Sequence, residues 1–463
     1  MKNYKHSVLL ACVNLLNIIL LTVPFALCWF GYYAKRIADP FYLKGNLLVV
    51  AMFTVLYVIF SRIYDAFEIS FHQVSELIGS QLLSLLFADG IMFLALCLMM
   101  RHFPNIFPAL AALAGQALFA AVWSVVTDKC YFALFPAKPS AVIYDVHCEM
   151  GDLVHRYGLE RKFDIRRVVN VNECWGNMDM LDGIEVLFLN DLHSHDRNIF
   201  LKYCVEKDIT AYVAPRVGDM LLSGARRKHM FHVSVLQVER YHPGLAYLFT
   251  KRLIDIVLSI VAILLLSPIM VITAAAIKIC DGGPILYKQA RLTQNGRRFN
   301  MPKFRSMRVD AEKDGVARLS AGDSDTRVTP VGRVIRKLRI DELPQLFCTL
   351  TGSMSLVGPR PERPEIAEQY TAELPEFSLR LQVKAGLTGY AQVYGKYNTL
   401  PYDKLQMDLL YIAHPSILED LRILFATVKT LFMSESTEGM EANVLLDQEI
   451  EAAKAENAVN STQ

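Results

Sequence analysis

The feature that most limits what this chain can fold into is a series of long apolar runs. Four of them precede residue 130, at roughly 7–33, 45–61, 77–100 and 107–127. The fourth contains the twenty uncharged residues FPALAALAGQALFAAVWSVV, enough for a helix to cross a hydrocarbon layer of about 30 Å. Because lipid offers the backbone no hydrogen bonds, such runs must be helical. We therefore predict a transmembrane four-helix bundle over residues 1–130, with both ends on the same side of the membrane.

Composition agrees with membrane segments. Hydrophobic residues make up 53% of the chain and mean hydropathy is +0.28, which is high for a wholly soluble protein. The nine cysteines include no C-x-x-C pair, and several lie in apolar runs. This pattern favours packed, reduced thiols over a disulfide framework or a cysteine metal site.

Charge is placed unevenly. Residues Lys288–Arg339 contain fourteen Lys/Arg and five Asp/Glu, although the formal net charge of the whole chain is only +2. Such a basic block indicates phosphate groups or anionic lipid as ligands, and we expect no nucleic-acid partner. Residues 434–463 contain seven acids and one lysine, and we expect them to form an acidic, mobile tail.

Between residues 139 and 240 the pattern changes to short β-branched runs. AVIYDV, IRRVVNV, IEVLFLN, ITAYVAP and FHVSVLQV alternate with helix-like segments such as HDRNIFLKYCVEKD. This alternation predicts a Rossmann-like α/β domain with a parallel sheet. The turn after AVIYDV continues HCEMGD and lacks the G-x-G-x-x-G that cradles a pyrophosphate. Tyr203 and Lys207 match the Y-x-x-x-K pair of short-chain dehydrogenases, but that match is common by chance, so we predict a structural or regulatory domain.

A fifth apolar run, residues 251–280, is interrupted in its middle by Ser267 and Pro268. Proline removes a backbone hydrogen bond and clashes with the carbonyl four residues earlier, so it kinks the helix. Ser267 could supply a donor to a freed carbonyl. The residues alone leave two alternatives open: a bent helix that returns to its original side, or a fifth, kinked span. The charged residues at its start, Lys251, Arg252 and Asp255, are expected to lie at the lipid headgroups.

Motifs concentrate after this run. Residues 283–312 predict a strand, a turn at Asn295-Gly296 and a second strand, and then the basic residues Lys303 and Arg305. Pro330 is suited to the first turn of a helix. Pro344 disfavours the α region at the residue before it and is suited to open a new helix.

The adjacent carboxylates Asp341 and Glu342 should therefore lie at a break between two helices. Backbone amides at the start of the second helix would favour their charged form. Taken alone, the pair could also be an ordinary solvated helix end.

Several motifs occur in order from about residue 250 to 433: KRLIDIVLS, the Ser-Pro break, GPILYKQAR, KFRSM, RIDELPQL, SMSLVGPRP and KAGLTGYAQV. In these motifs the chain resembles the bacterial sugar transferase family of polyprenyl-phosphate sugar-1-phosphate transferases. The four spans and the α/β domain resemble its large members, which initiate exopolysaccharide, O-antigen or capsule repeat units.

The resemblance implies a transfer of sugar 1-phosphate from a UDP-sugar to undecaprenyl phosphate, with release of UMP. It implies that Asp341 is the nucleophile of a covalent phosphosugar intermediate. Glu342 would assist, by binding Mg²⁺ or by handling the protonation of the acceptor. Lys303, Arg305, Arg336 and Arg360 would bind the phosphates of the donor. Arg339 stands where many members have a small hydroxyl residue.

The resemblance also implies a topology. It makes helix 251–280 re-entrant, with Ser267-Pro268 at the turning point, and places a mainly α catalytic domain (residues 250–433) on the cytoplasmic face of the bacterial inner membrane. It further implies a homodimer.

Two other functions remain possible interpretations of the sequence. One is a membrane-tethered nucleotide-sugar dehydratase or epimerase, which the missing glycine fingerprint disfavours. The other is a non-catalytic scaffold of a polysaccharide assembly complex, which would not need the Asp341-Glu342 pair and its basic neighbours.

Overall fold

The protein consists of two compact units, Met1–Ala214 and Pro215–Gln463. The structure is a computed structural model, and it describes residues 2–145, 154, 159–175, 177–190, 192–230, 232–241, 243–308, 327–395 and 400–432. The predicted acidic tail, residues 434–463, lies outside the described residues.

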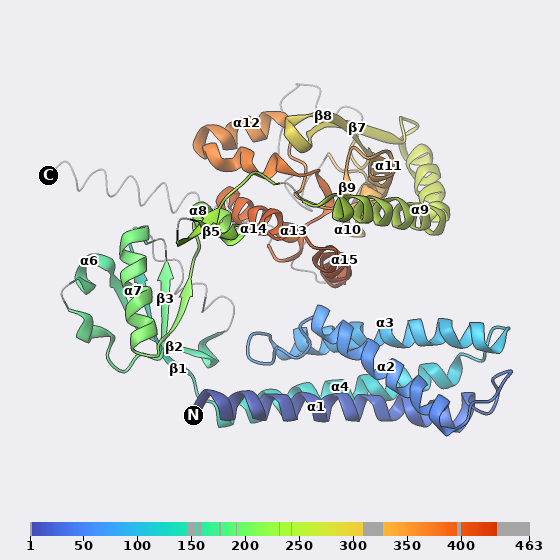
Figure 1. Ribbon diagram of the computed structural model, residues 1–463. Coiled ribbons are helices and arrows are strands. Elements are labelled where there is room, and N and C mark those ends of the chain that lie inside the picture. Colours follow the sequence, from blue (N-terminus) through green and yellow to red (C-terminus); the bar gives the residue numbers. More distant parts are fainter. Residues whose placement is uncertain are drawn as a thin grey trace. The chain divides into compact units, whose positions relative to one another are not determined.

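The first unit begins with four long apolar helices, shown in dark blue to turquoise in Figure 1. They are α1 (Lys2–Cys28, continued by a π-helical turn at Trp29–Tyr33), α2 (Leu43–Ile63), α3 (Val74–Met100) and α4 (Phe107–Leu134). Helices α1 and α3 each pack against both α2 and α4. Their outward faces carry large exposed side chains, for example Leu98 at 75% exposure. All four helices are long and apolar enough to cross a membrane, as the sequence predicts.

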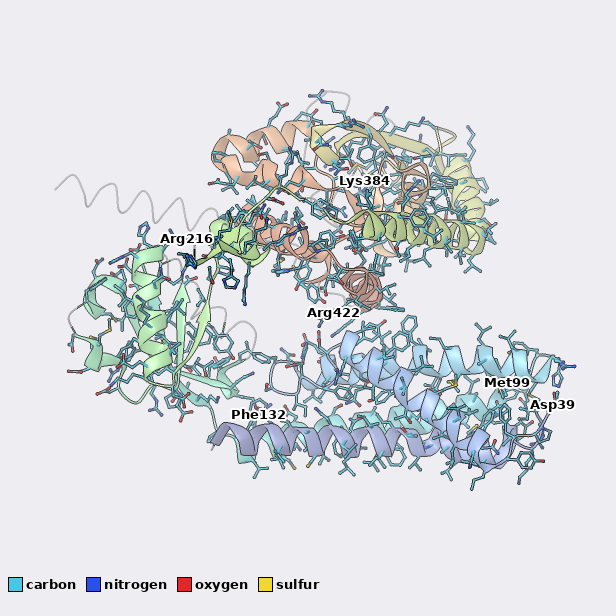
Figure 2. All side chains as sticks on the ribbon, in the orientation of Figure 1. Asp39, Met99, Phe132, Arg216, Lys384 and Arg422 are labelled. Carbon is cyan, nitrogen blue, oxygen red and sulfur yellow. The ribbon has the colours of Figure 1, made fainter. Side chains whose placement is uncertain are left out.

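A charged contact joins the α/β part of the first unit to the end of this bundle. Strand β1 (Lys138–Tyr144) follows α4 directly. The guanidinium of Arg161 lies 4.1 Å from the ring centre of Phe132, which Figure 2 labels, and 3.1 Å from the Asp128 carboxylate. The sheet therefore starts from a point fixed to the last turns of α4.

The four-stranded sheet is parallel throughout. Strands β1, β2 (Phe163–Asn170), β3 (Val186–Asn190) and β4 (Thr210–Val213) lie in the order β2-β1-β3-β4. Helix α7 (Ser194–Glu206) connects β3 to β4. The first four β-branched runs thus form the parallel sheet that the sequence predicts.

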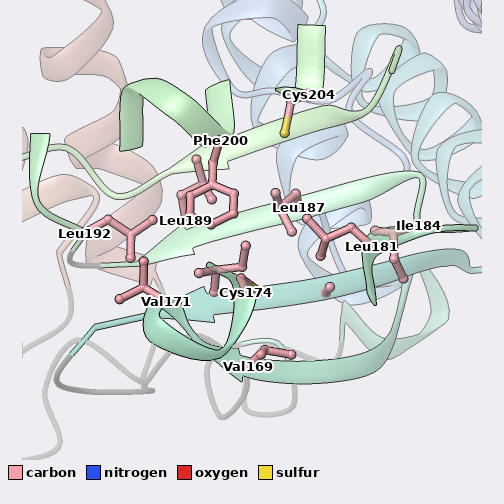
Figure 3. Packing of buried hydrophobic residues seen from close by; sticks show 12 residues of the cluster. Val169, Val171, Cys174, Leu181, Ile184, Leu187, Leu189, Leu192, Phe200 and Cys204 are labelled. Atoms are coloured by element: carbon pink, nitrogen blue, oxygen red, sulfur yellow. The ribbon is translucent and has the colours of Figure 1, made fainter. Parts of the chain in front are cut away.

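Side chains of the central strands alternate between two apolar layers, as the pleat requires. Ala141 and Ile143 point to one face, where they pack with Phe200 and Cys204 of α7; Figure 3 shows this cluster. Val142 points to the other face and packs against Phe188 and Phe163.

The fifth β-branched run does not belong to this sheet. It forms β6 (Val233–Gln237), which pairs antiparallel with β5 (Arg226–Met230) in the second unit. The two strands are joined by residues 231–232 alone, and a parallel connection needs a crossover of a dozen or more residues. The first unit ends at Ala214, so the prediction that the α/β domain extends to residue 240 is wrong for residues 215–240.

The second unit is a mixed region of helices and short strand pairs, and the predicted catalytic region lies within it. Its helices are α8 (Val217–Ser223), α9 (Leu245–Asp281), α10 (Pro330–Lys337), α11 (Leu346–Thr351), α12 (Pro364–Glu373), α13 (Tyr390–Val393), α14 (Pro401–Ala413) and α15 (Ile417–Phe432), with 3-10 turns at Ile340–Gln345 and Pro375–Gln382. Strands β7 (Leu286–Leu292) and β8 (Arg298–Phe304) pair antiparallel, and β9 (Ser355–Val357) pairs parallel with β10 (Gly386–Thr388). The turn between β7 and β8 has positive φ at Asn295 and Gly296, which confirms the predicted turn.

Helix α9 bends near its middle (Figure 1) and contains Pro268. The Ser267 hydroxyl donates a hydrogen bond of 2.8 Å to the carbonyl of Leu264. That carbonyl lies four residues before Pro268 and is the one that proline leaves without its helical donor. Ser267 thus supplies the donor to a freed carbonyl that the sequence predicts.

The charged residues at the start of α9 bind protein, so the expectation that they lie at the lipid headgroups is wrong. Lys251 lies 2.9 Å from the Asp420 carboxylate. Arg252 donates to the carbonyls of Thr349 and Leu350, at 2.7 Å each. Both carbonyls lie in the last turn of α11, where Thr349 also accepts from the amide of Gly352 at 3.1 Å, so the guanidinium of Arg252 completes the C-terminus of this helix.

Asp255, one turn further along α9, is also turned inward. It is 5% exposed and accepts hydrogen bonds from the amide of Leu356 and the hydroxyl of Ser355. The first turns of α9 are therefore fixed to α11, β9 and α15.

Candidate active site

The Asp341-Glu342 pair lies at a junction between two helices, as the sequence predicts. Helix α10 begins at Pro330, capped by the Thr329 hydroxyl, which accepts from the amide of Gly332 at 2.9 Å. It ends before Arg339, whose φ of 53° is left-handed. The chain then reverses into a 3-10 turn over Ile340–Gln345, which packs against β8, and α11 follows.

Glu342 is surrounded by positive charge. Its Oε1 lies 3.1 Å from Arg360 and 3.5 Å from Lys303, and its Oε2 lies 4.0 Å from Arg339. Burial by itself would raise the pKa of Glu342, but Arg360, Lys303 and Arg339 outweigh burial and hold that pKa at about 2. Glu342 is therefore an ionised carboxylate fixed among three cations.

Asp341 has the opposite environment. Its carboxyl group makes no hydrogen bond or ion pair with any residue that the structure describes. Burial raises the pKa of its carboxyl, and the charge of Glu342 raises it further, against the pull of Lys303 and two arginines. The two adjacent carboxylates thus differ: one is fully engaged by cations, and the other is left available to a ligand.

Three of the four predicted phosphate-binding residues lie around the pair. Lys303 comes from β8, Arg336 from α10, and Arg360 from the irregular segment after β9; Arg336 also donates to the Ser306 hydroxyl at 2.8 Å. Burial lowers the pKa of Lys303, opposed chiefly by Glu342.

Arg305 is placed differently from the other three. Its guanidinium packs so closely against Gly283 that a Cβ at residue 283 would collide with it. The strongest charges acting on Asp341 and Glu342 come from Lys303, Arg336, Arg339 and Arg360.

Sequence reasoning missed Arg339 as a member of the site. Arg339 stands at a position where a small hydroxyl residue is common in the family, and it lies two residues before Asp341 in the sequence. An i,i+3 relation to Glu342 was visible, but only the left-handed turn brings the two side chains together.

The site fits Mg²⁺ as far as its donor chemistry is concerned. Mg²⁺ prefers hard oxygen ligands and is usually held by one or two carboxylates together with water and substrate phosphates. Asp341 and Glu342 supply two such carboxylates, and the carboxyl of Asp341 forms no ion pair with a described residue. No group of three or more His, Cys, Asp or Glu side chains that could hold a metal occurs in the described part of the chain.

A cavity of about 350 Å³ adjoins this site. Arg360 and Glu362 line it on one side, and Phe377, Val383 and Ala385 contribute apolar walls. The cavity therefore combines Arg360, one of the cations around Glu342, with apolar walls, and it has the size of a small-molecule site.

Comparison with known proteins identifies the family. The model of the bacterial sugar transferase family matches residues 246–434, which include the acidic pair and its cations. The UDP-glucose:undecaprenyl-phosphate glucose-1-phosphate transferase of Caulobacter vibrioides is 38% identical over 42% of this chain and 74% of its own length. This chain belongs to the bacterial sugar transferase family.

Other relatives in the bacterial sugar transferase family are longer than the matched region. The UDP-N-acetylgalactosamine-undecaprenyl-phosphate N-acetylgalactosaminephosphotransferase of Aeromonas hydrophila is 39% identical over 50% of this chain and 54% of its own length. The UDP-glucose:undecaprenyl-phosphate glucose-1-phosphate transferase of Klebsiella pneumoniae is 41% identical over 40% of this chain and 41% of its own length. The chain thus matches about half or less of these two relatives.

Proposed function

We propose that this protein is a phosphoglycosyl transferase. It transfers a sugar 1-phosphate from a UDP-sugar to undecaprenyl phosphate and releases UMP, the first membrane step of surface polysaccharide repeat-unit assembly. The observation that carries the proposal is the contrast within the pair: Glu342 is fixed by three cations, while its neighbour Asp341 is left available. The names of the relatives supply the donor and acceptor classes.

In the first step, an Asp341 carboxylate oxygen attacks the phosphorus attached to the sugar. The bond from that phosphorus to the oxygen bridging to UMP breaks, and UMP leaves with the electron pair. In the second step, a phosphate oxygen of the acceptor attacks the same phosphorus, and the Asp341 carboxylate leaves. Splitting the displacement in this way uses a carboxylate both as nucleophile and as leaving group.

Glu342 holds the cations in place rather than moving a proton, because a carboxyl with a pKa of about 2 is a poor base. Lys303, Arg336 and Arg360 are positioned to bind the diphosphate of the donor. When bound, Mg²⁺ would neutralise phosphate charge, held by Asp341, Glu342 or both.

We propose that α9 is re-entrant. Its first half packs with the core around Leu356 and Leu409 through Ala262 and Ile263. Its second half packs against Phe304 and Ile335 through Met270, Ala274 and Ile277. A straight helix of 37 residues would extend about 55 Å and could not return to the same unit.

The side chains around the bend of α9, Leu264, Leu265, Val271 and Ile272, are each more than two-thirds exposed. They are suited to enter one leaflet of the bilayer. This topology keeps the site on the cytoplasmic face of the inner membrane, where UDP-sugars occur.

The decisive experiment measures UMP release by membranes containing the protein, with undecaprenyl phosphate, Mg²⁺ and a panel of UDP-sugars. We expect release with one or a few of these sugars. Asp341→Asn should abolish release at an unchanged level of membrane-bound protein. Normal turnover by this variant would overturn the assignment of the nucleophile.

The topology is tested separately by labelling single cysteines, placed before Leu253 and after Cys280 in a background without native cysteines, with an impermeant reagent. We expect both to react from the cytoplasmic side. Reaction from opposite sides would instead support a fifth transmembrane span.

A further inference from the structure

The segment that carries Arg360 has an unusual way of fixing its backbone. Residues 360–362 lie between β9 and α12 and belong to neither, and Pro361 has no amide hydrogen. Three consecutive carbonyls nevertheless each accept one hydrogen bond of 3.0 Å: Arg360 from Arg380, Pro361 from Arg291, and Glu362 from the amide of Leu292. Two arginine side chains therefore replace the ladder that a strand or helix would supply.

Arg380 is itself held by a buried ion pair. Its side chain is 4% exposed, and that of Asp408 in α14 is 2% exposed. The Arg380 Nε lies 2.8 Å and the Nη2 2.7 Å from the same Asp408 oxygen, and the Nη1 lies 3.5 Å from Glu362. With water excluded, this pair has little freedom to shift, and removing either partner would leave an uncompensated charge.

The connection reaches the acidic pair in two further steps. Arg380 fixes the carbonyl of Arg360, and the Arg360 guanidinium ends 3.1 Å from Glu342 Oε1. Because Arg360 lies in an irregular segment, the position of its guanidinium depends on how firmly its own backbone is held. A displacement of a substrate-binding group by about 1 Å can lower the rate by a large factor.

We propose that Arg380, locked by Asp408, is a positioning residue that sets Arg360 against Glu342 and the donor diphosphate. The inference rests on the proposed function. Only the planar fork of arginine serves the Asp408 carboxylate and the Arg360 carbonyl at once; lysine keeps the charge but not this geometry.

A double-mutant cycle tests the inference on the full chain in membranes, with UMP release as the readout. Arg380→Lys should lower kcat/KM for the UDP-sugar at least tenfold in the wild-type background. In an Arg360→Met background, the same change should alter the residual rate less than twofold, because Arg380 then has no clamp to position. An equal fall in both backgrounds would show a merely structural role and overturn the inference.

A matched control separates positioning from loss of packing. Asp420 is also buried and pairs with Lys251 at 2.9 Å in the same unit. Asp420→Asn should lower thermal stability, and its effect on UMP release should be the same whether or not Arg360 is present. Coupling of Asp420 to Arg360 as strong as that of Arg380 would contradict the inference.

Asp408→Asn provides a second route if Arg380→Lys does not accumulate in the membrane. It keeps the shape of the side chain and weakens the lock on Arg380, so release should fall several-fold only when Arg360 is present. If the wild-type protein releases UMP but these cycles are additive, the positioning role fails alone. If the wild-type protein releases no UMP with any UDP-sugar, the proposed function fails instead.

Discussion

The parallel sheet of the first unit and the centre of the second unit differ in where their charged side chains lie. In the sheet, the central strand β1 buries Ala141, Val142 and Ile143, and its neighbour β2 carries an ion pair, Arg166 with Asp164, that is about half exposed on both sides. The second unit buries charged groups instead. Asp255, Arg305, Arg380, Asp408 and Asp420 are all less than a tenth exposed.

The difference follows from what each backbone needs. In a sheet, the backbone N–H and C=O groups of neighbouring strands bond to one another. Apolar side chains are therefore sufficient to fill the layer between the sheet and its helix. The irregular segments around the acidic pair have no ladder, and buried charges supply their missing donors and acceptors. Burying a charge costs several kcal/mol unless it is paired, so such groups are placed where a specific backbone position must be held.

The largest effect should come from neutralising a carboxylate at the active site. The matched control neutralises a carboxylate on the sheet. Glu342→Gln should lower the rate of UMP release at least 100-fold, because a neutral amide leaves Lys303 and Arg360 without their shared counter-ion. Asp164→Asn, at the exposed pair on β2, should leave the rate within twofold. Comparable losses in single-turnover UMP release would break the contrast between the two regions.

The pH dependence of the residual activity sharpens this test. Asp341 must be ionised to attack, and its raised pKa places the acidic loss of activity above the range of an ordinary aspartate. Glu342→Gln removes a negative charge that raises this pKa, so the acid limb should move to lower pH. A limb that stays in place would show that another group controls it.

An intermediate effect is expected at the start of α9. Asp255→Ala removes the acceptor of the buried Leu356 amide and the Ser355 hydroxyl, which should destabilise the protein by about 1–3 kcal/mol. The measurement is the midpoint of thermal unfolding in detergent. The control is Ser259→Ala, which changes a fully buried side chain in the same helix. An equal shift of the unfolding midpoint in both variants would show that the hydrogen bonds of Asp255 do not stabilise the protein.

The smallest effect should come from the sheet itself. Ile143→Val removes one buried methylene from β1 and should cost about 1 kcal/mol of stability. UMP release per folded molecule should not change, because this core contains no charge that positions the site. A loss of activity larger than the loss of folded protein would show that the sheet does more than support the chain.

The sequence by itself determined the elements whose causes are local. The length of the apolar runs predicted the helices of the bundle, and the β-branched runs predicted the four parallel strands. Asn295-Gly296 set the turn between β7 and β8. Pro344 led to the prediction of a junction at Asp341 and Glu342, although the chain turns at Arg339 and Pro344 lies inside the 3-10 turn. Even the donor for the carbonyl freed by Pro268 was visible, because Ser267 is its neighbour in the chain.

Only the tertiary structure decided which distant groups meet. It moved β5 and β6 into the second unit, turned Lys251, Arg252 and Asp255 from the lipid into the protein, and left Arg305 against Gly283. It also brought Arg380 and Asp408, 28 residues apart, behind the backbone of Arg360. A buried charge is stable only beside a partner, and the partner's position in space depends on the packing of the whole unit, which no local pattern records.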